Sequence, residues 1–383
     1  MNILFYHPNL SEKRNNNKLT LFNLHNSNGF SGTENALIEI SRILVLRGHT
    51  IYIIYDNIDN NYEEIDGIKH ISINYFNNMD KKIIDWYSPL FYFMHPTNIH
   101  ILSQLKTKTK ILAWMHCMLK DEYVYIQYMR NLGFNIYIQC LSNYCVKFYE
   151  RLKPMFNNLQ DIWVINNGIS PAMTITPKPI KEKKGNWVFH ACFDRGGKEA
   201  INIFKAINIF NPEIATKFNI VSYNKENIEN LNENIIYNGS LSKYKLFELL
   251  GKSDYFIYPL IQPDGNVHHD NYSTTILEAM SMGVIVITWD VAHLKESFGD
   301  YIICVKTPSY ENYDPYSQFG INPLLSQKEA LYSLIEAILI LEMNPQEKEI
   351  RRTNGMKWAR QQTWKTKALA MEEKLLQYTP QKY

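Results

Sequence analysis

Cysteine is scarce in this chain, and no two cysteines are spaced to form a redox pair. The 383 residues include five cysteines, which are scattered and odd in number, with no Cys-x-x-Cys pair among them. This usage is typical of reduced thiols in the cytosol and not of a small secreted domain held by disulfides. We therefore expect a cytoplasmic protein. Its length of 383 residues is enough for two or three domains with large cores of their own.

Excess charge and long apolar runs are missing as well. Lys and Arg number 40 against 38 Asp and Glu, so no basic surplus indicates nucleic acid as the main partner. No apolar run approaches the roughly 20 residues of a membrane-spanning helix. The first residues, MNILFYHPNL, lack the basic start of a signal peptide. No clear basic amphipathic helix indicates a membrane-surface protein, although peripheral association with a membrane stays open.

Two kinds of cofactor motif are also absent. The sequence has no Gly-x-Gly-x-x-Gly fingerprint after a predicted strand, which argues against a dinucleotide. It has no Asp-x-Asp motif at a convincing strand end and no His, Cys or Asp cluster with metal-ligand spacing. We expect neither a metal ion nor a bound cofactor.

The most informative stretch of the sequence runs from Pro263 to Thr288. A polar loop with His and Asp residues precedes a helix that we expect to open near Tyr272, because apolar residues recur there at the spacing of a buried helix face. Gly283 marks the helix end, since a residue able to take positive φ is the usual C-terminal signal. The apolar β-branched run 284–288 follows directly. The pattern predicts half of a βαβ unit, with the loop at the ligand-binding edge of a parallel sheet.

The start of this helix is suited to an anion. Ser273, Thr274 and Thr275 begin it, so their N–H groups lack an acceptor within the helix and lie at its positive end. Glu278 follows on an apolar segment, where a carboxylate is costly unless it accepts hydrogen bonds such as those of paired ribose hydroxyls. Asp270 precedes it by eight residues on the loop side. The alternative is an ordinary buried helix with one capped glutamate.

The first half of the chain begins with a similar pattern. A strand at 2–7 is followed by a polar insertion at 11–28, by Gly32 and by a helix ending at 47–49. We expect the insertion to be a loose surface segment; an acceptor-side loop is the alternative. His116 follows another apolar strand at its carboxyl end, where ligand sites of open α/β sheets collect. A plain tight turn at Gly32 and a hydrogen-bonded structural role for His116 stay open.

A polar connector rich in proline and lysine separates this half from the next, and we place the domain boundary near 171–185. After it, a strand at 186–191 leads to Asp194-Arg195-Gly196-Gly197-Lys198 and a helix. A cation beside a glycine at a helix start suits a diphosphate, because the side chain supplies charge and the backbone supplies donors. The alternatives are a surface ion pair for Arg195 and a solvated side chain for Lys198. Further strands are predicted at 50–55, 68–73, 99–103, 111–115, 134–141, 161–165, 218–222, 235–238, 254–260 and 301–305, and tail helices at 327–341 and 361–377.

The segment from Asp270 to Gly283 resembles the donor-site signature of retaining GT-B glycosyltransferases, in particular the GT4-like family of group 1 glycosyl transferases. That family has Glu-x7-Glu continuing into Leu-Glu-Ala-Met-Ala-x-Gly-x-Pro-Val. Here Asp270-x7-Glu278 continues as Leu-Glu-Ala-Met-Ser-Met-Gly. The first glutamate is replaced by a shorter aspartate, and the proline by Ile285. A third departure is His190, which stands where the family has its first basic phosphate contact.

The resemblance implies an α/β protein with the GT-B fold: two facing Rossmann-like domains, a cleft between them and a C-terminal helix that crosses back. The implied domains are an acceptor-side domain at 1–172, a nucleotide-sugar donor domain at 185–360 and the returning helix at 361–383. Gly32 matches the glycine that abuts the donor phosphates. The turn that reads the base through its backbone would comprise Asn238, Gly239 and Leu241.

The implied reaction is transfer of a sugar from a nucleoside-diphosphate sugar, with UDP or GDP as the carrier, to a hydroxyl of a glycan, lipid or protein-linked acceptor, with retention of anomeric configuration. The donor is a co-substrate, so no cofactor is implied. Arg195 and Lys198, with the N–H groups at the helix start, would stabilise the leaving diphosphate, and Glu278 would hold the ribose. Asp270 and His116 would orient the sugar. The alternatives are an epimerase-type GT-B enzyme that needs no acceptor and a non-catalytic GT-B-like binding or scaffold protein.

Overall fold

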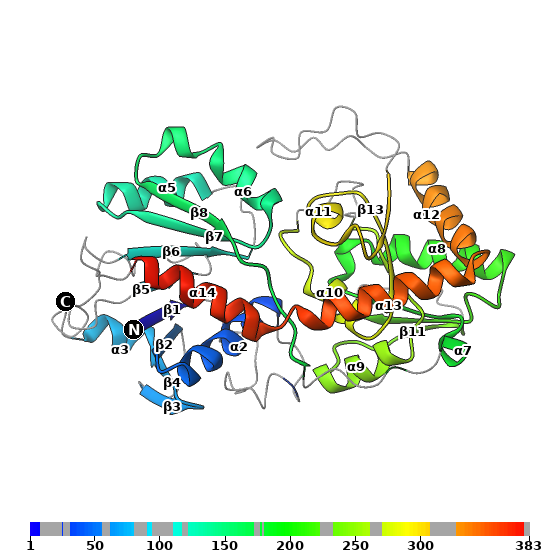
Figure 1. Ribbon diagram of the computed structural model, residues 1–383, viewed down its shortest axis with the longest axis horizontal. Helices are drawn as coiled ribbons and strands as arrows, with labels where there is room; N and C mark the ends of the chain where they lie inside the picture. The colour runs from blue at the N-terminus through cyan, green and yellow to red at the C-terminus, as the bar shows by residue number, and fades with distance from the viewer. Residues whose placement is uncertain are drawn as a thin grey trace. The chain divides into compact units, whose positions relative to one another are not determined.

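The computed structural model describes residues 1–7, 25, 31–55, 62–79, 90–93, 110–116, 122–171, 177, 180–222, 233–260, 270–306 and 327–378. The chain divides into two compact units. The first unit comprises residues 1–24, 30–168 and 364–383, and the second comprises 25–29 and 169–363. Figure 1 shows the elements of both units.

The first unit is built on an eight-stranded sheet in the order β3-β4-β2-β1-β5-β6-β7-β8. All neighbouring strands run parallel except the edge strand β3, which is antiparallel to β4. Strands β1 and β6 are buried apolar runs, as strands inside a parallel sheet covered on both faces require. The strands are β1 (Asn2–Tyr6), β2 (Thr50–Tyr55), β3 (Tyr62–Ile65), β4 (Ile68–Ser72), β5 (Leu90–Phe93), β6 (Lys110–Met115), β7 (Ile136–Cys140) and β8 (Leu159–Val164).

The last helix of the chain, α14 (Trp364–Tyr378), packs in the first unit against α2 (Gly32–Leu46), as Figure 1 shows in red and blue. Glu372 of α14 accepts hydrogen bonds from Arg47 Nε at 3.0 Å and from the His49 ring at 2.8 Å. The Arg-Gly-His turn after α2 therefore fastens the C-terminal helix. The other helices among the described residues of this unit are α3 (Ile73–Asn78), α5 (Glu122–Asn131), α6 (Asn143–Glu150) and the 3-10 turn Lys153–Met155.

The second unit contains a six-stranded, wholly parallel sheet in the order β11-β10-β9-β12-β13-β14. Numbered from its first strand, this is 3-2-1-4-5-6, the Rossmann order, and the direction of winding reverses between β9 and β12. The strands are β9 (Asn186–His190), β10 (Lys217–Val221), β11 (Ile235–Tyr237), β12 (Tyr255–Tyr258), β13 (Ile285–Trp289) and β14 (Ile303–Val305). The two parallel sheets confirm the predicted α/β class.

The helices of the second unit cover its sheet, and α10 lies along α13. The site described below depends on three of them, because α8, α9 and α10 all begin at one edge of the sheet. They are α8 (Gly197–Phe210), α9 (Lys243–Gly251) and α10 (Thr274–Ser281); the others are α7 (Ile180–Lys183), α11 (Leu294–Phe298), α12 (Gln327–Glu342), α13 (Pro345–Gln361) and the 3-10 turn Phe193–Arg195.

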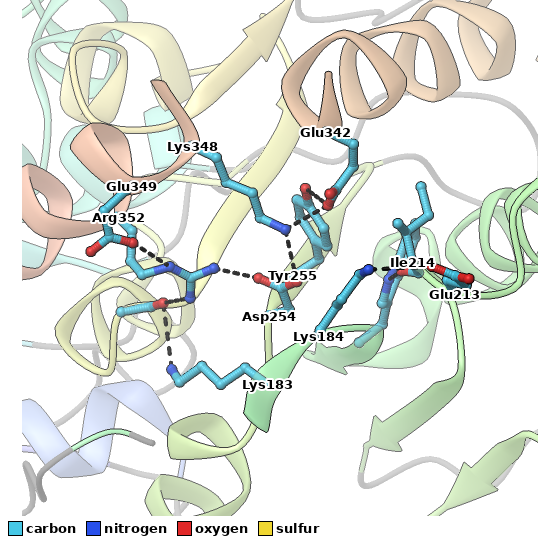
Figure 2. Close-up of polar contacts among 12 residues, drawn as sticks. Lys183, Lys184, Glu213, Ile214, Asp254, Tyr255, Glu342, Lys348, Glu349 and Arg352 are labelled. Atoms are coloured by element: carbon cyan, nitrogen blue, oxygen red, sulfur yellow. Dashed lines mark hydrogen bonds and ion pairs between the residues drawn. The ribbon is translucent and has the colours of Figure 1, made fainter. Parts of the chain in front are cut away.

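A buried ionic network fastens α13 at the amino end of β12. Figure 2 shows Arg352 and Lys348, both from α13, converging on Asp254. Lys348 Nζ lies 2.9 Å from Asp254 Oδ2 and 2.5 Å from Glu342 Oε1. Asp254 is 1% exposed. Since a buried carboxylate without partners costs several kcal/mol, these cations determine where α13 can dock.

The structure also corrects the predicted elements. Helix α13 was not predicted, because it buries Lys348 and Arg352 and so lacks an apolar stripe at helical spacing. Strands β3 and β5 were not predicted either. The predicted strand 99–103 and most of the insertion 11–28 lie outside the described residues. The helix expected to open near Tyr272 begins at Thr274, and Gly283 takes the expected positive φ, 67°, after its end.

Candidate functional site

The candidate site lies at the carboxyl ends of β9 and β12, where the winding of the second sheet reverses. Ligands of doubly wound folds bind at this kind of edge. The two strands pair directly, and the turns that follow them are joined by a hydrogen bond from Leu260 N to Arg195 O at 3.1 Å. Residues after β9 and after β12 therefore form one surface.

Two adjacent glycines let these turns approach closely. Gly196 has φ of 98°, and a Cβ atom added there would lie 2.8 Å from Pro259 Cβ, in the chain segment after β12. A Cβ on Gly197 would lie 2.4 Å from the Phe193 ring. No side chain caps α8, whose first residues are Gly197 and the exposed Lys198. The first N–H groups of the helix thus have no side-chain cap, and they lie at the edge of the sheet.

Asp270 and Arg195 form the polar centre of this edge. Arg195 Nη1 lies 3.4 Å from Asp270 Oδ2 and 3.3 Å from the Tyr258 hydroxyl, and that hydroxyl donates to Asp270 Oδ2 at 2.9 Å. Ser273 Oγ donates to the same oxygen. Burial alone would raise the pKa of Asp270, but Arg195 and these hydroxyls lower it to about 2. Asp270 is therefore a fixed anion at neutral pH.

Helix α10 begins beside this centre without a side-chain cap. Ser273 occupies the N-cap position, but its hydroxyl donates a hydrogen bond to Asp270 and accepts none from the backbone of the helix. Thr274 and Thr275, the first two helical residues, are half-buried. The first amide donors of α10 thus have no side-chain acceptor, which is the arrangement that favours an anion.

The other end of α10 is heavily bonded to cations. Lys183 Nζ donates to Met282 O at 2.7 Å, Arg352 Nη1 to Gly283 O at 2.5 Å, and Arg360 Nε to Ser281 O at 2.9 Å. Cations at a helix C-terminus complement the helix dipole. Figure 2 shows Lys183 and Arg352 meeting at this point. The helix is anchored at its carboxyl end, while its amino end is left open at the sheet edge.

Glu278 points to a second part of the same edge, where it meets two bases. Lys243, the first residue of α9, donates to Glu278 Oε1. His190 Nδ1 lies 3.8 Å from Glu278 Oε2. Burial, with a smaller effect of Lys243, lowers the pKa of His190 to about 3, so the imidazole is neutral at pH 7. Glu278 is only 3% exposed, and its Oε2 accepts no hydrogen bond from any described residue.

The turn predicted to read a base follows β11. Asn238 Nδ2 donates to Asn219 Oδ1 and to Ile236 O, each at 3.3 Å, so the side chain is held within the turn. Gly239 takes φ of 65°, and a Cβ there would meet nothing within 4 Å. Leu241 is half-buried just before α9. The backbone of this turn is thus fixed close to Lys243.

The two remaining predicted residues, Gly32 and His116, belong to the first unit. Gly32 is the first residue of α2, whose start has a complete capping box: Ser31 Oγ accepts from Glu34 N at 3.4 Å, and Ser31 N donates to Glu34 Oε2 at 2.6 Å. His116 follows β6, and its ring centroid lies 4.6 Å from that of Trp114. The other ten predicted residues all lie in the second unit.

Sequence reasoning missed three side chains at this edge. Tyr258, at the end of β12, holds Asp270; its place at the end of a buried strand was a usable signal. Lys243 was missed although a lysine at a helix start opposes the helix dipole and so demands an acidic partner. His293 stacks on Tyr272 with ring centroids 5.7 Å apart, and nothing in the local sequence indicated that contact.

In the part of the chain that the structure describes, no group of three or more His, Cys, Asp or Glu side chains is arranged to hold a metal ion. In the same residues, no helix is both long enough and apolar enough to span a membrane.

Comparison with known proteins gives one family match and many structural matches. Residues 196–310 match the family described as Glycosyl transferases group 1. Sucrose-phosphate synthase from Thermosynechococcus elongatus superposes with a TM-score of 0.70 at 13% identity, covering 98% of both chains. A glycosyltransferase from Rickettsia africae gives 0.63 at 15% identity over 99% of both. The pneumococcal O-GlcNAc transferase GtfA, solved with UDP and GlcNAc, gives 0.63 at 9% identity over 98% of this chain and 99% of that one.

No curated protein matches the sequence. At these identities the structural matches establish the fold. The family match covers the segment that contains Asp270 and Glu278, and it begins directly after Arg195. The resemblance to the GT4-like, group 1 glycosyl transferases is thereby confirmed, and the fold of this chain is that of the GT-B glycosyltransferases.

Proposed function

We propose that this protein is a retaining, metal-independent glycosyltransferase that moves a sugar from a nucleoside-diphosphate sugar to a hydroxyl acceptor. One observation supports this most directly. Arg195 and the uncapped starts of α8 and α10 face one edge of the second sheet, at its topological switch point. A cation beside two helix starts that lack a side-chain cap is complementary to a diphosphate.

The leaving diphosphate would receive its charge stabilisation from the protein. As the glycosidic bond breaks, negative charge grows on the phosphate, and fixed donors in place beforehand stabilise it without reorganisation. Arg195 would supply the charge, with Lys198 and the N–H groups of Thr274 and Thr275 beside it. Asp270 holds the guanidinium in place. This donor set makes a divalent cation unnecessary, so added EDTA should leave the activity unchanged.

The rest of the donor would be held by residues that the resemblance assigns. Glu278 would accept hydrogen bonds from the ribose, and the backbone of Asn238, Gly239 and Leu241 would contact the base. Asp270 and His116 would orient the sugar so that the acceptor hydroxyl attacks from the face of the leaving group, which retains the configuration. Gly32 would let the backbone approach the phosphates closely without adding charge.

UDP is the first nucleotide to test. One structural neighbour, from Escherichia coli, was solved with UDP-2-fluoro glucose (TM-score 0.61, 9% identity), and the pneumococcal transferase with UDP and GlcNAc. The sugar and the acceptor of this chain remain to be screened once the base is known.

A thermal-shift panel with UDP, GDP, ADP, CDP and NAD tests the proposal. A ligand that binds only the folded protein raises its melting temperature. We expect a shift with one nucleoside diphosphate and none with NAD, and loss of that shift in Glu278→Ala. A response to NAD alone would refute the transferase. Nucleotide binding with neither transfer nor donor turnover would favour a binding protein, and conversion of the donor sugar without an acceptor would favour an epimerase.

A further inference from the structure

Lys243 is placed where a lysine is locally unfavourable. It is the first residue of α9, and a cation at a helix N-terminus opposes the helix dipole. Nevertheless its side chain is largely buried, with 17% of its surface exposed. The unfavourable helix dipole and the burial of the charge must both be offset by a partner of opposite charge. That partner is Glu278 of α10.

Glu278 depends on this lysine for its charge balance. Its side chain is 4% exposed, and the basic side chains that approach it among the described residues are Lys243 and His190. Because His190 is neutral at pH 7, Lys243 is the only cation paired with this carboxylate in the described structure. A buried carboxylate that loses its cation is strongly disfavoured.

The pair also leaves one buried oxygen of Glu278 without a hydrogen bond from any described residue. Lys243 occupies Oε1, while Oε2 has no hydrogen-bond donor among the described residues. His190 Nδ1, 3.8 Å away, likewise has no partner there. A ligand hydroxyl can donate to the carboxylate and accept from the imidazole, so this gap between a fixed acceptor and a neutral ring suits a sugar hydroxyl.

We propose that Lys243 is a positioning residue that fixes Glu278 to accept hydrogen bonds from the ribose hydroxyls, so that the pair selects ribonucleotide over deoxyribonucleotide donors. This inference rests on the proposed function, since it assumes that a nucleotide binds at this edge. The inference adds to the proposed function by assigning ribose selectivity to a cation on α9, which lies outside the Asp270–Gly283 segment.

The test is calorimetric titration with UDP and with 2′,3′-dideoxy-UDP, or with the same pair on whichever base the thermal-shift panel selects. Hydrogen bonds to a charged acceptor contribute about 1.5–3 kcal/mol, so the wild-type protein should prefer the ribonucleotide by roughly 10- to 100-fold. In Lys243→Met this preference should fall below about 3-fold. Lys243→Arg should keep most of it, because the cation is retained.

The ratio separates positioning from other roles of the lysine. A general loss of positive charge near the diphosphate lowers the affinity for both nucleotides by the same factor, and so does partial unfolding of the protein. In either case the ratio of the two affinities is unchanged. Lys252→Met is the matched control: Lys252 closes the same helix and is paired at the surface with Glu248, so the ratio should stay at its wild-type value. Should Lys243→Met fail to fold, Lys243→Gln keeps a donor without the charge, and the same fall in ratio is expected.

Two outcomes are distinguishable. If neither nucleotide binds the wild-type protein, the proposed function fails. If the wild type binds them with a clear preference and the Lys243 variants preserve it, or if the wild type binds both equally, the donor site can stand but the role of Lys243 is overturned.

Discussion

The helix starts of the two units use the same kind of position in opposite ways. In each unit, a helix between the first two strands begins with a glycine, Gly32 in α2 and Gly197 in α8. Helix α2 satisfies its own start with Ser31 and the carboxylate of Glu34. Helix α8 has no side-chain cap, and a glycine in the left-handed region precedes it.

The difference shows that a glycine before a helix does not by itself predict an anion site. A helix start binds an anion when its donors are free, and an internal carboxylate at the same place competes for them. In the second unit neither α8 nor α10 has a side-chain cap, and Arg195 lies in the turn just before α8. We therefore attribute the binding of the diphosphate charge to the second unit.

The largest effect should come from Arg195→Ala. Removing one donor from a preorganised site for developing charge typically costs about 100- to 1,000-fold in turnover. Steady-state kinetics with the donor sugar should show a fall in kcat of this size. Arg351→Ala removes a half-exposed arginine that is paired with Glu347 on α13, and its kinetics should match the wild type. Equal kinetics in both variants would refute the role of Arg195.

Acid should destabilise the second unit at pH values well above the range in which Asp270 titrates. Burial lowers the pKa of His190 to about 3 and that of His293 to about 4, so below pH 6.5 the unfolded chain binds protons that the folded one excludes. Stability should fall with pH by up to about 1.4 kcal/mol per pH unit for each histidine. The stabilisation from Asp270, whose pKa is about 2, is lost only below about pH 4. Urea unfolding at pH 7, 6 and 5 measures the slope, and His190→Asn should reduce it. A flat profile would contradict the buried neutral histidines.

Two glycine substitutions test how tightly the turn after β9 is packed. Gly196→Ala combines a left-handed φ with a contact to Pro259 that is too short for real atoms. We therefore expect the free energy of unfolding to fall by about 1–3 kcal/mol. Gly239→Ala also requires a left-handed φ, but no atom lies near its added Cβ, so about 1 kcal/mol is expected. Denaturant unfolding should rank them in this order. A reversed order would mean that the two turns do not approach as described.

The smallest effect is expected in the first unit. Ser31→Ala removes the N-cap of α2 and should cost about 1 kcal/mol of stability. Because the start of α2 is closed by Glu34, nucleotide affinity should not change. A tenfold change in UDP affinity would break the comparison, since it would mean that the capped start of α2 supplies hydrogen bonds to the phosphates.

The sequence predicted the fold where local patterns determine structure. Buried β-branched strands and glycine-terminated helices gave the two parallel sheets, and Gly283 ends its helix as expected. Helix α13 was not predicted because charged residues, Lys348 and Arg352, occupy its buried face. That arrangement becomes favourable only when Asp254, about a hundred residues earlier in the chain, is brought beside it, and no local pattern reveals such a partner.

The candidate site divides in the same way. Asp270, Glu278 and Arg195 could be found because their spacing and their glycine neighbours are local features. The partners that hold them, Tyr258 and Lys243, come from other elements. Their contacts depend on which strands are neighbours in the sheet, which a single sequence does not specify. The roles of the predicted site residues remain predictions.

The most direct test is the affinity of the protein for uridine, UMP and UDP, measured by titration calorimetry in the wild type and in Arg195→Ala. If the starts of α8 and α10 with Arg195 bind the diphosphate, each added phosphate should tighten binding to the wild type, by roughly 100-fold or more from uridine to UDP. Most of that gain should vanish in Arg195→Ala. Equal affinity for all three ligands, or a gain that Arg195→Ala leaves intact, would contradict a diphosphate site at this edge.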